Sequence, residues 1–400
     1  MSVVAYALEL RDLIRSLIDV RPEPCEFNWL PLPEPRRPVA YSVEDGGQGD
    51  RKLRTYTVFA LKAWGAGFVD GEAPRSFQEG FVGVVVPQGL EQDQRMRRYR
   101  QVLELEVALK SMVPGGLVLF DGTPPMRWGR VGAKTTWEES LEAAARHIIK
   151  HRGALEGLTK GTCSAPDVDC LAEVLEGATR RPLSARALMR LVREGALGIG
   201  NSLRDYYPIL ALESLERLLL FRRVIEAAWS RGSTPVFVVK TSRSTSFCGG
   251  SLPDVHLVEA TLRARGSFEP GYAVANVYSS VYDYFGLSKR ERSMYPDVGG
   301  LRDFYENRLA VASAFVRLRA GGFIFKVEVL YDRSAGAGDP AGLLREVVSR
   351  LSSLPLTSEG YPLPLVVADS NSRVARAEME AAMRALGLDL TPESRSMLRV

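Results

Sequence analysis

The sequence lacks any uncharged apolar stretch of about 18 residues, so we expect no helix that spans a membrane. Residues 1–20 are apolar at helical spacing, but Glu9, Arg11 and Asp12 interrupt them, which indicates an amphipathic helix and not a signal peptide. Four cysteines in 400 residues predict no disulfide framework and a cytoplasmic, reducing location. Three scattered histidines disfavour a zinc site.

Lysine is also scarce, with nine lysines against 43 arginines. The net charge is only +4. Arginine matches phosphate geometry and stays protonated at any working pH. A GC-rich genome would produce the same bias, and we prefer that explanation. The composition is that of a globular protein, with 46% hydrophobic and 25% charged residues.

The order of periodic segments predicts an α/β or α+β sheet core with a helical insertion. We divide the chain into an N-terminal helix and proline-rich arm (1–50), a first part of the core (51–135), a mostly helical insertion (136–231) and a second part of the core (232–400). Within these parts we expect a polar loop at 43–51, a hairpin at 66–87, a helix at 91–113, a strand at 117–120, strands at 235–240, 255–262, 272–278, 309–319 and 323–331, a helix at 340–353, a strand at 362–369 and a helix at 372–387.

Acidic residues stand at strand ends. Asp70 and Asp121 each end an apolar strand and precede a glycine. Sites are often built at strand ends in such sheets, although a turn is the simpler explanation for one Asp-Gly pair. Glu104 lies on the helix between them and is slightly favoured over Glu106 by its helical face. Three such carboxylates would bind hard divalent ions such as Mg²⁺ or Mn²⁺.

Two later segments add candidates. Lys240 emerges from an apolar strand beside hydroxyl groups and Arg243. It could contact a phosphate there, although a lysine that caps the strand edge or pairs with a carboxylate is the simpler explanation. Asp369 ends another apolar run and could be a fourth ligand or a helix N-cap. The segment GRVGAKT (129–135) fails as a P-loop because Ala133 replaces the required glycine.

The motifs FVDGE (68–72), VLELE (102–106), LVLFDGT (117–123), VVKTSRS (238–244) and GYPLPLVVADSNSRV (360–374) together resemble the NurA nuclease family. Each motif is short, but all five occur in the family's order over residues 65–388. The resemblance implies an RNase H-like mixed sheet, related to the Argonaute nuclease domain and flanked by helices, in a homodimer.

The resemblance also implies an activity. The implied protein is a DNA nuclease that acts as a 5′→3′ exonuclease and as a single-strand endonuclease. It uses Mn²⁺ or Mg²⁺ and binds two of these ions. The implied partners are DNA, the hexameric HerA translocase and the Mre11–Rad50 pathway. The implied metal ligands are Asp70, Glu104 and Asp121, with Asp369 where many members have His, and Lys240 and Tyr361 complete the catalytic set.

We expect Asp70 to bridge the ions, Lys240 to neutralise a phosphate oxygen, and Tyr361 to bind phosphate, stack on a base or sit in the core. Four arginines at the start of the 91–113 helix are candidate DNA contacts, together with Arg243: Arg95, Arg97, Arg98 and Arg100. A solvated surface is the alternative for these four. A non-catalytic DNA-binding adaptor and an RNA-directed enzyme are the alternatives.

Overall fold

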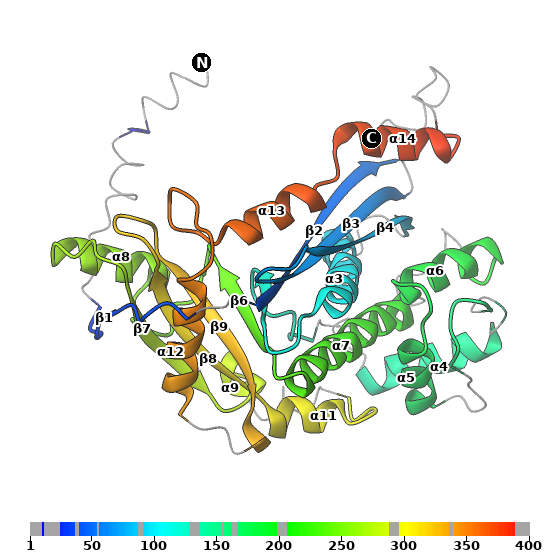
Figure 1. The fold of residues 1–400 in the computed structure, drawn as a ribbon. Coiled ribbons are helices and arrows are strands. Elements are labelled where there is room, and N and C mark those ends of the chain that lie inside the picture. Colours follow the sequence, from blue (N-terminus) through cyan, green and yellow to red (C-terminus); the bar gives the residue numbers. More distant parts are fainter. Residues whose placement is uncertain are drawn as a thin grey trace.

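The computed structural model describes residues 10–11, 25–36, 40–53, 56–86, 91–128, 137–151, 153, 156–161, 167–197, 206–287, 296–335 and 339–388. In this part of the chain one mixed sheet has the strand order β1-β7-β8-β9-β6-β5-β2-β3-β4 (Figure 1). The strands are β1 (Leu30–Pro31), β2 (Ala40–Lys52), β3 (Thr57–Val69), β4 (Arg75–Val85), β5 (Leu117–Asp121), β6 (Thr234–Val239), β7 (Gly271–Tyr278), β8 (Leu309–Arg317) and β9 (Phe325–Asp332).

Strands β5 and β6 lie at the centre, and their apolar runs are buried on both faces. β5 runs parallel to β2 and to β6, whereas the other neighbouring pairs are antiparallel. A parallel centre covered on both faces requires continuous apolar strands, which explains the sequence of β5.

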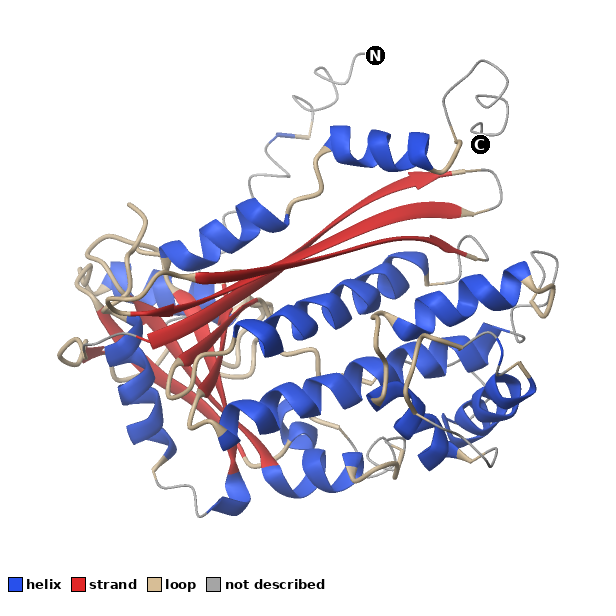
Figure 2. Ribbon diagram, turned by 45° about the vertical axis from the view of Figure 1, so that its right-hand side comes forward, coloured by secondary structure: helices blue, strands red, loops and turns tan. Residues whose placement is uncertain are grey.

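Helices cover both faces of the sheet (Figure 2). On one face lie α3 (Gln92–Ser111), α7 (Tyr207–Ser230), α8 (Asp254–Ala264), α9 (Val281–Phe285), α11 (Leu301–Asp303) and a π-helix at Phe304–Arg308. On the other face lie α12 (Pro340–Leu351), α13 (Leu363–Ser372) and α14 (Arg376–Ala385). Around α7 pack α4 (Trp137–Lys150), α5 (Val168–Glu176) and α6 (Leu183–Arg193), and a 3₁₀ turn at Arg333–Ala335 follows β9.

Three segment predictions were wrong. Residues 43–51 form part of β2, not a loop, because β2 pairs with β3 along its whole length despite three glycines. Residues 255–262 belong to α8 and residues 363–372 to α13, whereas we expected strands. Short apolar runs fit either element, and proline is tolerated in the first turn of a helix, as in α13.

Other parts agree with the sequence prediction. The hairpin β3–β4, helix α3, the helical segment α4–α7 and the β8–β9 pair occur as expected. The predicted N-terminal helix falls almost entirely outside the described residues. Among the helices that the structure describes, none is long and apolar enough to cross a membrane. The division into domains stays a prediction.

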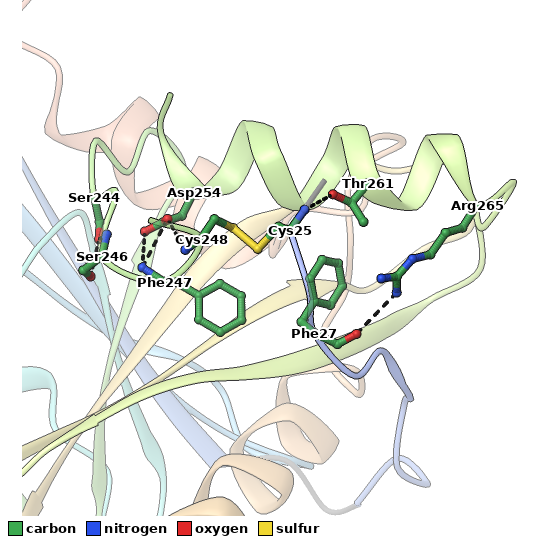
Figure 3. Close-up of a disulfide and its surroundings, with 9 residues drawn as sticks. All are labelled: Cys25, Phe27, Ser244, Ser246, Phe247, Cys248, Asp254, Thr261 and Arg265. Carbon is green, nitrogen blue, oxygen red and sulfur yellow. Dashed lines mark hydrogen bonds between the residues drawn. A yellow bond between two sulfur atoms is a disulfide. The ribbon is translucent and has the colours of Figure 1, made fainter. Parts of the chain in front are cut away.

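A disulfide joins the N-terminal arm to the loop that follows β6 (Figure 3). Cys25 is bonded to Cys248, 223 residues away in the loop between β6 and α8. The Cys25 amide donates to Thr261 Oγ1 at 3.0 Å, and Phe27 packs against Phe247. The arm is therefore fixed to the loop that Lys240 begins.

The prediction that the four cysteines form no disulfide framework was wrong. Besides the Cys25–Cys248 bond, Cys170 is disulfide-bonded, whereas Cys163 lies outside the described residues. The bridges do not identify a compartment, because intracellular proteins of hyperthermophiles also carry disulfides.

Candidate active site

The site is built where one central strand ends before its neighbour. β5 pairs with β2 only from Tyr41 to Glu44 and ends at Asp121, whereas β2 continues to Lys52. The edge of β2 beyond Asp45 therefore has no β5 residue beside it. A cavity of about 800 Å³ opens here, and its lining includes Glu44, Glu104 and Asp121.

Two aspartates approach each other from neighbouring parallel strands. Glu44 is in register with Phe120, so Asp45 follows at the level of Asp121. Side chains alternate along strands, so both aspartates point to the side of α12 and α13, as do Val43 and Leu119. Neighbouring strands lie about 5 Å apart, which brings the two carboxylates to one place.

Asp121 is held by two donors. Lys240 Nζ lies 2.9 Å from its Oδ2 in an ion pair, and the Tyr361 hydroxyl donates to its Oδ1 at 3.3 Å. Tyr361 is only 3% exposed, and its ring packs between Phe323 and the Lys240 ammonium. It therefore orients Asp121, and its buried ring leaves no face on which a DNA base could stack.

Two glycines let other elements approach Asp45. A Cβ at Gly46 would lie 2.3 Å from Glu104 Oε1, so only glycine lets the α3 carboxylate reach β2 here. A Cβ at Gly47 would lie 2.2 Å from the carbonyl oxygen of Ser372, at the end of α13. Ser372 Oγ donates to Asp45 Oδ2 at 3.2 Å. The segment Asp45-Gly46-Gly47 thus joins the strand to a helix on each face.

Glu104 comes from α3, on the opposite face of the sheet from Asp121. Its Oε1 lies 2.9 Å from Arg100 Nε, one helical turn away. Burial raises the pKa of Glu104 to about 7, and repulsion from Asp45 and Asp121 adds to the rise, which Arg100 opposes. The group therefore takes up a proton more readily than an ordinary glutamate.

The same crowding affects β2 itself. Burial, and then repulsion from Glu104, Asp45 and Asp121, raises the pKa of Glu44 well above its ordinary value. Burial also raises the pKa of Asp45, to which Asp121 and Asp369 contribute repulsion. A carboxylate cluster of this kind favours a bound cation because the cation removes the repulsion.

Asp369 lies near this cluster, whereas Arg243 stands three residues after Lys240 in the chain. Asp369 lies on α13 and forms an ion pair with Arg373 one helical turn later. Its negative charge raises the pKa of Asp45 and of Tyr361. It therefore stands in the middle of a helix, where we had expected a strand end. Arg243 is exposed in the loop after Lys240.

The structure does not bring Asp70 to the site. It is exposed and follows β3, whose last residue Val69 pairs with Ala40 at the start of β2. Because β2 and β3 are antiparallel, Asp70 lies beyond the start of β2, roughly 17–20 Å along the strand from Asp45. Asp45, on the strand that we had read as a loop, occupies the place that we assigned to Asp70.

The arginines at the start of α3 have different environments. Arg95 is fully buried and bonds to Glu213 at 2.8 Å, and Arg98 is buried beside Glu91 and Glu213. These two therefore hold α3 against α7 and cannot contact DNA. Arg97 is exposed and lines the cavity, and Arg100 pairs with Glu104.

The donor set fits a hard divalent cation, since it consists of carboxylates only. As they stand, no three acidic, histidine or cysteine side chains among the described residues converge closely enough to hold a metal ion. Two of these carboxylates are engaged in ion pairs, Glu104 with Arg100 and Asp121 with Lys240. Both cations are partly exposed to solvent, so these two pairs can open.

Comparison with known proteins decides the family. The sequence matches the NurA domain over residues 44–374. The chain belongs to the NurA family. None of the curated proteins matches the sequence.

Solved NurA structures share the fold. The NurA nuclease from Sulfolobus solfataricus is 17% identical, with 98% of each chain covered and a TM-score of 0.58. A NurA structure with manganese is 16% identical, covering 95% of this chain and 98% of that chain at a TM-score of 0.56. A NurA structure bound to dAMP and manganese is 14% identical, covering 99% and 97% at a TM-score of 0.57. The nine-stranded sheet is therefore the NurA fold, as the motifs predicted.

The crowded carboxylates predict how metal-free stability depends on pH. An acid whose folded-state pKa is raised keeps its proton on folding, so stability is lost as pH rises from the ordinary value near 4.5 to about 7. Asp45→Asn removes one partly buried charge and should raise the metal-free melting temperature at pH 8 more than at pH 5. Thermal unfolding in EDTA measures the melting temperature at both pH values.

Asp70→Asn is the matched control, because the exposed Asp70 should leave the melting temperature unchanged at both pH values. If Asp45→Asn melted at a lower temperature than the parent protein at pH 8, the folded protein would stabilise the Asp45 carboxylate without a metal.

Proposed function

We propose that this protein is a metal-dependent deoxyribonuclease that hydrolyses phosphodiester bonds with Mn²⁺ or Mg²⁺. The observation that carries the proposal is the approach of Asp45, Asp121 and Glu104 around the open end of β5. The NurA structures with manganese and with dAMP support the choice of metal and of a nucleotide substrate.

Divalent cations, when bound, would supply the charge that activates a water molecule and stabilises the leaving oxygen. Asp45, Asp121 and Glu104 would hold them. Asp369, whose charge acts on Asp45, would assist in binding them. Tyr361 and Lys240 keep Asp121 oriented, and the partly exposed ammonium of Lys240 can also neutralise a non-bridging phosphate oxygen.

We infer a path for the DNA strand along α3. Arg97 and Gln101 line both the catalytic cavity and a second cavity of about 790 Å³. Arg97 and Glu104 are seven residues apart on one helical face, about 10 Å along the axis. Arg127, Tyr284 and Phe285 line the second cavity, which therefore offers cations for phosphates and aromatic rings for bases.

The finer activity and the partners follow from the family resemblance. We infer 5′→3′ exonuclease and single-strand endonuclease activity in a homodimer that works with a HerA-type hexameric translocase and the Mre11–Rad50 pathway. The lack of a P-loop in the sequence supports a separate motor, since this chain has no ATPase motif of its own.

Asp45→Asn should reduce cleavage by more than about 100-fold, because removing a direct ligand exceeds the roughly 10–100-fold cost of removing an outer partner. The assay incubates DNA with Mn²⁺, with and without EDTA, and compares 5′-labelled with 3′-labelled strands to read polarity.

Asp70→Asn is again the control and should cleave like the parent protein. Equal activity of Asp45→Asn and the parent would remove Asp45 from the mechanism. EDTA-resistant cleavage would remove the metal, and DNA binding without any cleavage would favour the adaptor alternative.

Arg97→Gln combined with Arg127→Gln should weaken single-stranded DNA binding. It should also lower the slope of log affinity against log salt by roughly 0.7 for each phosphate that the protein no longer neutralises. Fluorescence anisotropy at several salt concentrations measures the slope. Arg345→Gln, an exposed position on α12, should leave it unchanged, and an unaltered slope in the double variant would contradict the inferred path.

A further inference from the structure

Glu44 is a buried carboxylate for which the mechanism above has no use. It is 4% exposed, and its Oε2 has no hydrogen-bond partner among the described residues. The residue lines the catalytic cavity. A carboxylate so placed is strongly unfavourable unless a cation or donor compensates it.

Arg100 is the cation whose charge acts on Glu44, and it is already paired with Glu104 at 2.9 Å. The other charges that act on Glu44 are the carboxylates Glu104, Asp45 and Asp121. The surroundings therefore repel a negative charge at Glu44 as they stand.

The position of Glu44 relative to Glu104 is built by the strand. Glu44 and Gly46 are two apart on β2 and share the face that α3 covers, and Gly46 is the residue against which Glu104 lies. Asp45 points to the opposite face. β2 thus presents one carboxylate on each side of the point where β5 ends.

We propose that Glu44 is a further ligand of a hard divalent cation, Mn²⁺ or Mg²⁺, which it shares with Glu104 on the α3 side of the sheet. This inference rests on the proposed function, because it adds a ligand to the same metal centre. Asp45 and Asp121 hold metal from the other face. The buried, unpartnered oxygen of Glu44 is the ligand atom.

The test is Mn²⁺ binding to the full-length protein without DNA, measured by isothermal titration calorimetry. Glu44→Gln keeps the shape and removes the charge, and it should weaken Mn²⁺ binding by about 10-fold or more. Glu328→Gln is the matched control, because Glu328 is also buried, on the same face of the sheet, but pairs with Lys326 at 2.7 Å. It should bind Mn²⁺ like the parent protein.

Thermal unfolding in EDTA shows whether the variants are folded, and Glu44→Gln should be at least as stable as the parent. If the Glu44→Gln variant does not fold, Glu44→Met replaces it in the titration, because methionine fills a similar volume without a charged group. Unchanged Mn²⁺ affinity in the folded variant overturns the assignment of Glu44.

Parallel cleavage assays distinguish a failure of this inference from a failure of the proposed function. A parent protein that binds Mn²⁺ and cleaves DNA, with unchanged Mn²⁺ binding in Glu44→Gln, contradicts only the role of Glu44. A parent protein that neither binds Mn²⁺ nor cleaves DNA contradicts the proposed function and the inference together.

Discussion

Strand β5 ends at Asp121 while β2 continues to Lys52, and this difference in length shapes the whole site. Beyond the end of β5, no strand separates the two faces of the sheet along this edge of β2. Carboxylates from α3, from β2 and from β5 can therefore gather around one point. Their burial and mutual repulsion raise the pKa of Asp45 and bring that of Glu104 to about 7. The fold thus holds together negative charges that proteins normally keep apart, and a cation is what relieves their repulsion.

Local sequence patterns predicted the central elements because their periodicity is strong. The uninterrupted apolar run of β5 requires burial on both faces, and α3 has a long helical period with glycines at its end. The same rules failed where tertiary contacts decide. β2 contains three glycines and charged residues, yet it is a strand because β3 pairs with all of it. α13 carries an apolar run that suits either element, and its covering of β2 selects the helix.

The site was partly predictable for the same reason. Glu104, Asp121 and Lys240 stand on or directly after elements that the sequence indicates, whereas Tyr361 precedes a segment predicted as a strand and found as α13. The structure brings them together. The rule that a strand-borne Asp precedes glycine applied to Asp45 as well as to Asp70, and only the pairing register shows which of them faces Asp121. The environments of Arg95 and Arg98 depend on Glu213, more than a hundred residues away, which no local pattern reveals.

The most direct test of the metal centre is the position of the bound ion. Crystals of the protein grown with Mn²⁺ give an anomalous scattering signal at the ion. We predict peaks within coordination distance of Asp45, Asp121 and Glu104, with Arg100 turned away from Glu104. A peak at Asp70, or none near the end of β5, would contradict the assignment.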